Sequence, residues 1–235
     1  MRPGPRLATA AGNIVRVFRG GQLEATFTGY AGTIEHVGVD GDEVFATTEA
    51  PAALVVDTIG DPARRRTFRA GTKPIADVRF DREHGRIIGA SLDQFLYVWD
   101  AATGALVGKL EGTGPLWGVR ASPDGALAVG VGGVSPTVWN RADGARLHQL
   151  EGHSDLVRDG TFLGDRLFLS LAWNRTAIVW DVDSGRALTR FHEVDEIAFS
   201  EPRGAVALVG ATGVRIWTPH APVPDLDALR AHGAP

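Results

Sequence analysis

The sequence predicts an all-β protein built from a repeated unit of about forty residues. An aromatic residue followed by a turn-forming stretch recurs at this spacing, most clearly in YVWDAATGAL, TVWNRADGARL and IVWDVDSGRAL. Within each period, short apolar runs alternate with polar residues and are separated by turn sequences, which is typical of antiparallel strands and not of helices. A period of this length indicates a solenoid, a propeller or an array.

In each repeat one anchor residue is followed by a turn-forming stretch. The predicted anchors are Phe18, Val56, Trp99, Trp139, Trp180 and Trp217. Gly and Pro are spread evenly, so no second domain is indicated, and residues 1–235 are interpreted as one domain. The segment 219–235 is expected to form a tail with a weak last strand or a short helix.

Four strands fit in each period. In the third repeat they are PIADVRF (Pro74 to Phe80), RIIGASL, FLYVWD and LVGKL, and the fourth repeat shows the same order. Tight hairpin turns are predicted at Asp124-Gly125, Asp143-Gly144 and Ser184-Gly185, where Gly accepts the positive φ of the turn.

These repeats resemble the WD-repeat family of β-propellers over essentially the whole chain, most strongly in repeats three to five. The resemblance implies a six-bladed β-propeller of four-stranded antiparallel blades around a central channel, with the anchor packed between neighbouring blades. It also implies a buried hydrogen-bonded set in each blade. Only the fifth repeat approaches this set, with His153, Ser170, Asn174 (where the family has Asp) and Trp180. The third repeat keeps Ser91 and Asp93 without the His.

The first blade is expected to be incomplete. Arg6 to Ala11 already reads as a second strand, so this blade lacks an inner strand of its own. Three alternatives remain open: a three-stranded blade, a tail from Asp225 to Arg230 that fills the gap, or a strand from a partner. Because an incomplete sheet exposes unpaired backbone groups, strand exchange or self-association through this blade is one consequence.

Composition excludes several function classes. A net charge of −4 argues against a general nucleic-acid or anionic-membrane surface. With no cysteine there is no disulfide framework, thiolate nucleophile or sulfur-ligated metal. No apolar run is long enough for a signal peptide or a membrane span, so a cytoplasmic protein is expected, and the Arg-, Ala- and Gly-rich composition suggests a bacterial source.

The sequence contains no catalytic signature: neither a phosphate-binding Gly-rich loop, nor a nucleophile elbow, nor paired metal-binding histidines. We therefore expect a non-catalytic protein-interaction scaffold without cofactor or metal. Two tryptophans are not anchors, and Trp and Arg dominate binding hot spots. The predicted partner-binding residues are Trp117, Arg158 and Trp173, with a charged rim from Glu35 and Asp195.

An alternative is a propeller enzyme, or a binder of small ligands or divalent cations, that uses acidic residues at the channel mouth. Aligning the inner strands places Glu35, Ala76, Trp117, Arg158 and Asp195 in one column. The next column contains His36, Asp77, Gly118, Asp159 and Glu196. The plainer interpretation is that these acids bond to the backbone or pair with Arg79 and Arg120, because a hard cation needs six or more oxygen ligands at close range.

Overall fold

The computed structural model describes residues 4–49, 53–69, 71–200 and 203–218, and these contain six antiparallel sheets of three or four strands. The predicted all-β class is therefore confirmed. The chain divides into two compact units, Met1–Glu111 with Pro115–Val119, and Gly112–Gly114 with Arg120–Pro235. The tail at 219–235, expected to hold a weak last strand or a short helix, lies outside the described residues, and so does the segment 225–230 that could fill the first blade.

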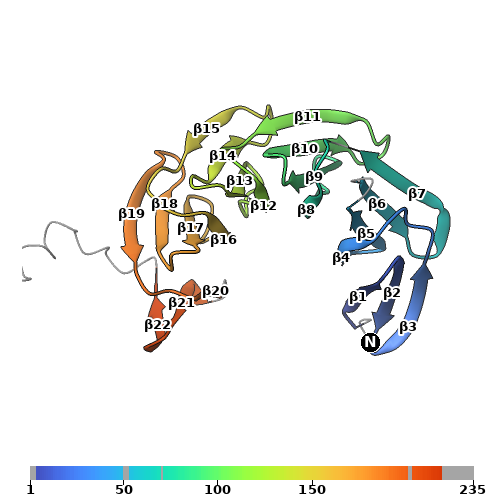
Figure 1. The fold of residues 1–235 in the computed structure, drawn as a ribbon, viewed down its shortest axis with the longest axis horizontal. Helices are drawn as coiled ribbons and strands as arrows, with labels where there is room; N and C mark the ends of the chain where they lie inside the picture. The colour runs from blue at the N-terminus through green and yellow to red at the C-terminus, as the bar shows by residue number, and fades with distance from the viewer. Residues whose placement is uncertain (1–3, 50–52, 70, 201–202, 219–235) are drawn as a thin grey trace, which may run out of the picture. The chain divides into compact units, whose positions relative to one another are not determined.

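The first unit contains three sheets (Figure 1). Sheet 1 consists of β1 (Arg6–Ala11), β2 (Ile14–Arg19) and β3 (Gln22–Phe27). Sheet 2 consists of β4 (Ile34–Asp40), β5 (Glu43–Thr48), β6 (Ala53–Thr58) and β7 (Asp61–Arg69). Sheet 3 consists of β8 (Ile75–Asp81), β9 (Arg86–Ser91), β10 (Phe95–Asp100) and β11 (Leu106–Glu111). Sheet 1 has three strands, in line with the expected incomplete first repeat.

The second unit contains most of sheet 4 and all of sheets 5 and 6. Sheet 4 consists of β12 (Leu116–Ala121), at which the two units divide, with β13 (Leu127–Gly132), β14 (Thr137–Asn140) and β15 (Arg146–Gln149). Sheet 5 consists of β16 (Val157–Phe162), β17 (Leu167–Ala172), β18 (Ala177–Asp181) and β19 (Arg186–Phe191). Sheet 6 consists of β20 (Glu196–Ser200), β21 (Ala205–Gly210) and β22 (Gly213–Trp217).

Buried apolar clusters join consecutive sheets within each unit. In the first unit, Trp99 of sheet 3 packs with Leu54 and Phe68 of sheet 2. In the second unit, Trp180 of sheet 5 packs with Val129 of sheet 4, and the Trp217 ring meets Phe191 edge to face. Each of these anchors therefore packs toward the sheet that precedes it in the chain, where it buries most of its ring.

Strand register defines the anchor position independently of the amino acid that occupies it. In sheet 5, Trp180 lies opposite Phe168, the second residue of β17, and the next strand bulges immediately before it. Sheet 3 repeats this arrangement with Trp99 opposite Ile87. Phe18, Trp139 and Trp217 also lie opposite the second residue of the strand before them.

In sheet 2 the register corrects the sequence assignment. The second residue of β5 is Val44, and its partner is Asp57 and not Val56. The bulge against β7 also falls between Val56 and Thr58. Aligning the chain on the letters LVVD and YVWD misplaced the anchor by one residue, because the pairing of β6 with β5, and not the similarity of the letters, defines the position. A carboxylate therefore occupies the position that is aromatic in the other sheets.

Candidate functional site

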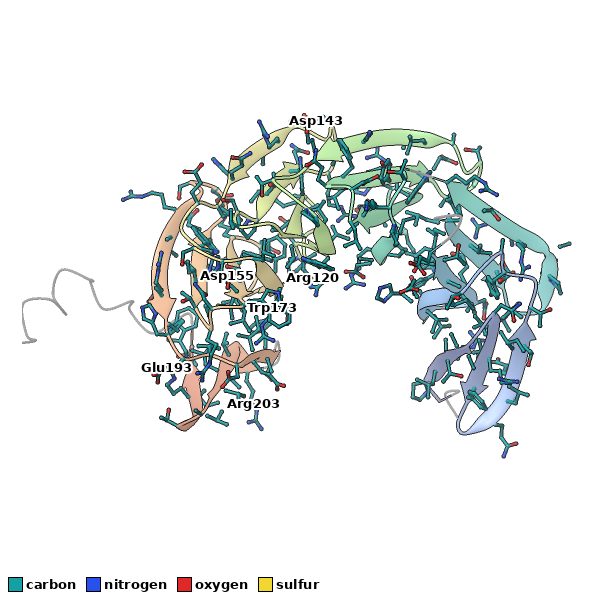
Figure 2. The ribbon with its side chains drawn as sticks, in the orientation of Figure 1. Arg120, Asp143, Asp155, Trp173, Glu193 and Arg203 are labelled. Atoms are coloured by element: carbon teal, nitrogen blue, oxygen red, sulfur yellow. The ribbon has the colours of Figure 1, made fainter. Side chains whose placement is uncertain are left out.

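Trp173 lies in the turn between β17 and β18 and is 59% exposed. The guanidinium of Arg158, from β16, lies over the ring of Trp173, which is labelled in Figure 2, with the guanidinium carbon 5.0 Å from the ring centroid. An exposed indole would normally be free to rotate, but a cation held over one face restricts it. The contact therefore favours one orientation of the exposed ring.

Further contacts hold Arg158 and the loop before β20. Arg158 donates from Nη2 to the backbone carbonyl of Asp195. The Asp195 carboxylate accepts from Arg175, with 2.7 Å to Nε and 2.9 Å to Nη2. Sequence reasoning missed Arg175, and it assigned Arg158 and Asp195 to the partner. In the structure both residues are engaged within the unit and act to hold Trp173 in place.

The other two predicted partner-binding residues belong to the first unit. Trp117 lies on β12 and is 45% exposed. Glu35 lies on β4, where the register shifts between Ile34 and His36, and its side chain is exposed. The structure thus brings together Arg158, Trp173 and Asp195 and leaves Trp117 and Glu35 in the other unit.

The structure brings three of the four residues of the expected buried set together in sheet 5. Ser170 Oγ lies 2.7 Å from His153 Nε2 and accepts a hydrogen bond of 2.7 Å from Trp180 Nε1. Burial, aided by the nearby charge of Arg190, lowers the pKa of His153 to about 4. The imidazole is therefore neutral at pH 7, and a single hydroxyl links it to the buried indole.

Asn174 lies apart from this set. Its amide donates to Ser154 Oγ at 3.0 Å and its carbonyl accepts from Thr176 N at 3.2 Å. In the described part of the chain, His153 Nδ1 has no hydrogen-bond partner. Asn174 thus shapes the turn that carries Trp173 and does not contact the imidazole.

Sheet 3 is also arranged differently from its sequence interpretation. The register places Gly89 at the position of Ser170, and Ser91 lies two residues further on, where it bonds to the carbonyls of Lys73 and Pro74. A Cβ on Gly89 would lie 2.8 Å from the Trp99 ring, so the ring itself fills this space. Asp93 accepts from the Tyr97 hydroxyl at 2.8 Å.

Sheet 2 contains a charged cluster that sequence reasoning missed. Asp57 is buried at the anchor position and accepts from the Tyr30 hydroxyl at 2.6 Å. Arg65, from β7, donates to both oxygens of this carboxylate at 2.6 and 3.1 Å, and its guanidinium lies over the Tyr30 ring. Burial and the adjacent carboxylate raise the pKa of Tyr30. Tyr30 lies in the loop before β4, and His153 lies in the loop before β16. This shared position is the signal from which the cluster could have been predicted.

Two acidic residues of the inner columns, Asp77 and Asp159, have local partners. Asp77 accepts from Arg79 at 2.9 Å and from Val119 N at 3.2 Å. Asp159 accepts from Arg120 at 3.2 Å. Among the described residues, no three or more His, Asp or Glu side chains are grouped so as to hold a metal ion. Nor do these residues include a helix long and apolar enough to cross a membrane.

Comparisons with known proteins give a fold and a distant relative. No protein-family model matches the chain. The mouse Pre-mRNA-processing factor 17 is 23% identical over 132 residues, and its human counterpart is 22% identical over the same length. The match covers 54% of this chain and 23% of either relative, so the chain spans well under half the length of these proteins. The crystal structure of the computationally designed Ika8 protein superposes with a TM-score of 0.72 at 21% identity, over 90% of this chain and 70% of that one. These likenesses establish a shared fold.

Proposed function

We propose that this chain is a six-bladed propeller of the WD-repeat type that acts as a non-catalytic protein-interaction scaffold in the bacterial cytoplasm. The six antiparallel sheets, the recurring anchor position and the distant similarity to a pre-mRNA-processing factor support this proposal. Because fold alone does not give function, the proposal depends on the surface around Trp173.

The observation that carries the proposal is an exposed tryptophan with a cation over one face of its ring. Trp173 exposes more than half of its surface, yet Arg158 covers one ring face and is itself bonded to the Asp195 carbonyl. A large aromatic ring that is already ordered loses little conformational entropy when a partner covers it. Tryptophan is also the residue type most enriched in binding hot spots.

Pull-down from lysate of the source organism, with mass spectrometry, tests this function. Trp173→Ala should lose the specific partner while folding as well as the wild type, because the ring is exposed. Leu147→Ala is the matched control, since Leu147 lies on β15 of the same unit and is 42% exposed. Arg158→Ala should weaken capture to a smaller degree, because the indole remains but is no longer held.

The result of the pull-down shows whether the partner binds at the surface around Trp173. Loss of capture in Trp173→Ala with retention in Leu147→Ala assigns the partner to this surface. Equal capture by the wild type, Trp173→Ala and Leu147→Ala removes Trp173 from the site. Trp117 of the first unit is then the next candidate.

A further inference from the structure

The exposed apolar surface of the second unit extends beyond Trp173. Leu156 is 39% exposed and Val134 is 44% exposed. Backbone hydrogen bonds tie their three segments together, since Trp173 N donates to the Leu156 carbonyl at 3.0 Å and Val157 N donates to the Gly133 carbonyl at 2.7 Å. Val134, Leu156 and Trp173 are named here the apolar strip.

Backbone hydrogen bonds order the segments that carry the strip. Trp173 occupies a turn position that holds Leu92 in sheet 3, where the same bond runs from Leu92 N to the Pro74 carbonyl. Isolated exposed apolar residues are common on soluble proteins, but a contiguous set on ordered backbone marks an interaction surface. The strip consists of three exposed apolar residues on segments that backbone hydrogen bonds join.

Acidic groups surround the strip. Asp155 adjoins Leu156, is partly buried, and accepts only from the Leu156 backbone N–H among the contacts described. A cavity of about 250 Å³ opens beside Arg158, and it is lined by Arg158, Asp159, Leu171, Asp195, Glu196 and Ile197. Three carboxylates and one guanidinium thus line this space, and the same guanidinium lies over the Trp173 ring.

The arginines of the unit leave part of this negative charge unbalanced. Arg175 and Arg120 pair with Asp195 and Asp159. Arg158 stacks on Trp173 and donates to a carbonyl. No cation lies within ion-pair distance of Glu196 in the part of the chain that the structure describes. The outer strands add Arg190 and Arg215, which donate to the carbonyls of Gly152 and His192.

On the basis of the proposed scaffold function, we infer that the apolar strip binds a peptide segment of a partner protein in which an apolar side chain is flanked by Lys or Arg. The apolar side chain covers Trp173 and Leu156. The basic side chain enters the cavity beside Arg158 and approaches Glu196, where it gains a carboxylate partner. A flanking acid would instead meet Asp155 and Glu196, so like-charge repulsion would select against it.

Selection of random displayed peptides on the immobilised full chain, with counter-selection on Trp173→Ala, tests this inference directly. We expect enrichment of sequences with a bulky apolar residue next to Lys or Arg. One enriched peptide is then synthesised with its flanking residues as Lys, Gln or Glu, and its Kd is measured by fluorescence anisotropy. The Lys form should bind about fivefold more tightly than the Glu form at low salt, in the range of an exposed ion pair. High salt should narrow this difference.

Two variants assign the effect to the named residues. Glu196→Gln should reduce the preference for Lys over Glu and leave binding of the Gln form unchanged. Leu156→Ser should weaken all three forms, whereas Leu147→Ser should weaken none. Enrichment of acidic flanks, a preference unaffected by Glu196→Gln, or no peptide that depends on Trp173 would overturn the inference.

The two proposals fail separately. A cellular partner that is lost in Trp173→Ala but contacts the strip through an acidic segment leaves the scaffold function standing and removes only the basic ligand. Equal capture by wild type and Trp173→Ala removes both.

Discussion

Sheets 2 and 5 use the same three backbone positions and fill them with opposite chemistry. The residue in the loop before the first strand is Tyr30 in sheet 2 and His153 in sheet 5. The fourth residue of the second strand is Ala46 or Ser170, and the anchor is Asp57 or Trp180. In sheet 5 a hydroxyl bridges two neutral rings. In sheet 2 the phenol reaches the carboxylate itself.

This difference shows that the repeats share the anchor position and not a tryptophan at that position. A tryptophan at the anchor stabilises the sheet through buried apolar area and one hydrogen bond. A carboxylate at the same position must be compensated, and Arg65 from the outer strand supplies that charge. Because desolvating both ions offsets much of their attraction, sheet 2 gains less net stability and depends more on keeping all its partners.

The largest effect is expected from Trp180→Ala. The indole is fully buried in the cluster that joins sheets 4 and 5, so its removal leaves a large cavity and should lower the free energy of unfolding by about 3–5 kcal/mol. Chemical denaturation followed by far-UV circular dichroism measures this. A loss of about 1 kcal/mol or less would mean that the anchor is dispensable, and the contrast with Asp57 would disappear.

Breaking the ion pair of sheet 2 should have the next largest effect and should be asymmetric. Arg65→Met leaves the buried Asp57 carboxylate with Tyr30 alone and should cost about 3 kcal/mol, in the range for a buried charge that has lost its partner. Asp57→Leu should cost less, because the Arg65 side chain is 32% exposed and can turn to water.

The double variant Arg65→Met with Asp57→Leu supplies the control for this pair. We expect it to be more stable than Arg65→Met alone, since no charge is then buried without a partner. Additive losses in the two single variants would show that the residues are not coupled, contrary to this account.

The repeat and the strand class were predictable because they depend on periodicity and turn residues. The predicted strand Pro74 to Phe80 corresponds to β8 at Ile75–Asp81, and the predicted turn at Asp124-Gly125 lies between β12 and β13. Both follow from local alternation and from Gly at a positive φ, which the residues themselves encode. The anchor of sheet 2 was not predictable in this way, because it is defined by the pairing of β6 with β5, and the aspartate at this position does not resemble the aromatic anchors of the other sheets.

The candidate site was predictable only in part, for a similar reason. Counting tryptophans singled out Trp173, since it could not be an anchor. The roles of Arg158 and Arg175 depend on where the Asp195 carbonyl and carboxylate point, and that is a property of the folded loop. The spacing of the residues could not show that Arg158 supports the Trp173 ring and does not donate to the partner.

Acid should weaken sheet 5 through His153. Its pKa is about 4 in the folded protein, against about 6.5 in the unfolded chain, so the unfolded state binds more protons between these values. The stabilising contribution is present above pH 6.5 and is lost as the pH falls toward 4. We expect this residue to contribute a loss of about 1–3 kcal/mol across that window.

His153→Gln isolates this contribution from carboxylates that titrate in the same range. The free energy of unfolding of the variant should fall less steeply between pH 7 and pH 4.5 than that of the wild type. Parallel curves for the two proteins would mean that His153 is charged in the folded state as readily as in the unfolded one.

Ser170→Ala should have the smallest effect of the series. The substitution removes the hydroxyl that serves both His153 Nε2 and Trp180 Nε1, but it leaves the packing of both rings in place. Sheet 3 shows that the anchor can be buried without a hydrogen bond to its indole N–H. Trp99 is fully buried, and its Nε1 has no partner among the described residues. The substitution removes two hydrogen bonds, each worth about 1 kcal/mol net, so the cost should be about 1–2 kcal/mol. A shift of the Trp180 indole N–H resonance in a ¹H–¹⁵N spectrum would report the lost bond directly. A loss as large as that of Trp180→Ala would instead show that the hydroxyl, and not the buried ring, holds sheet 5 together.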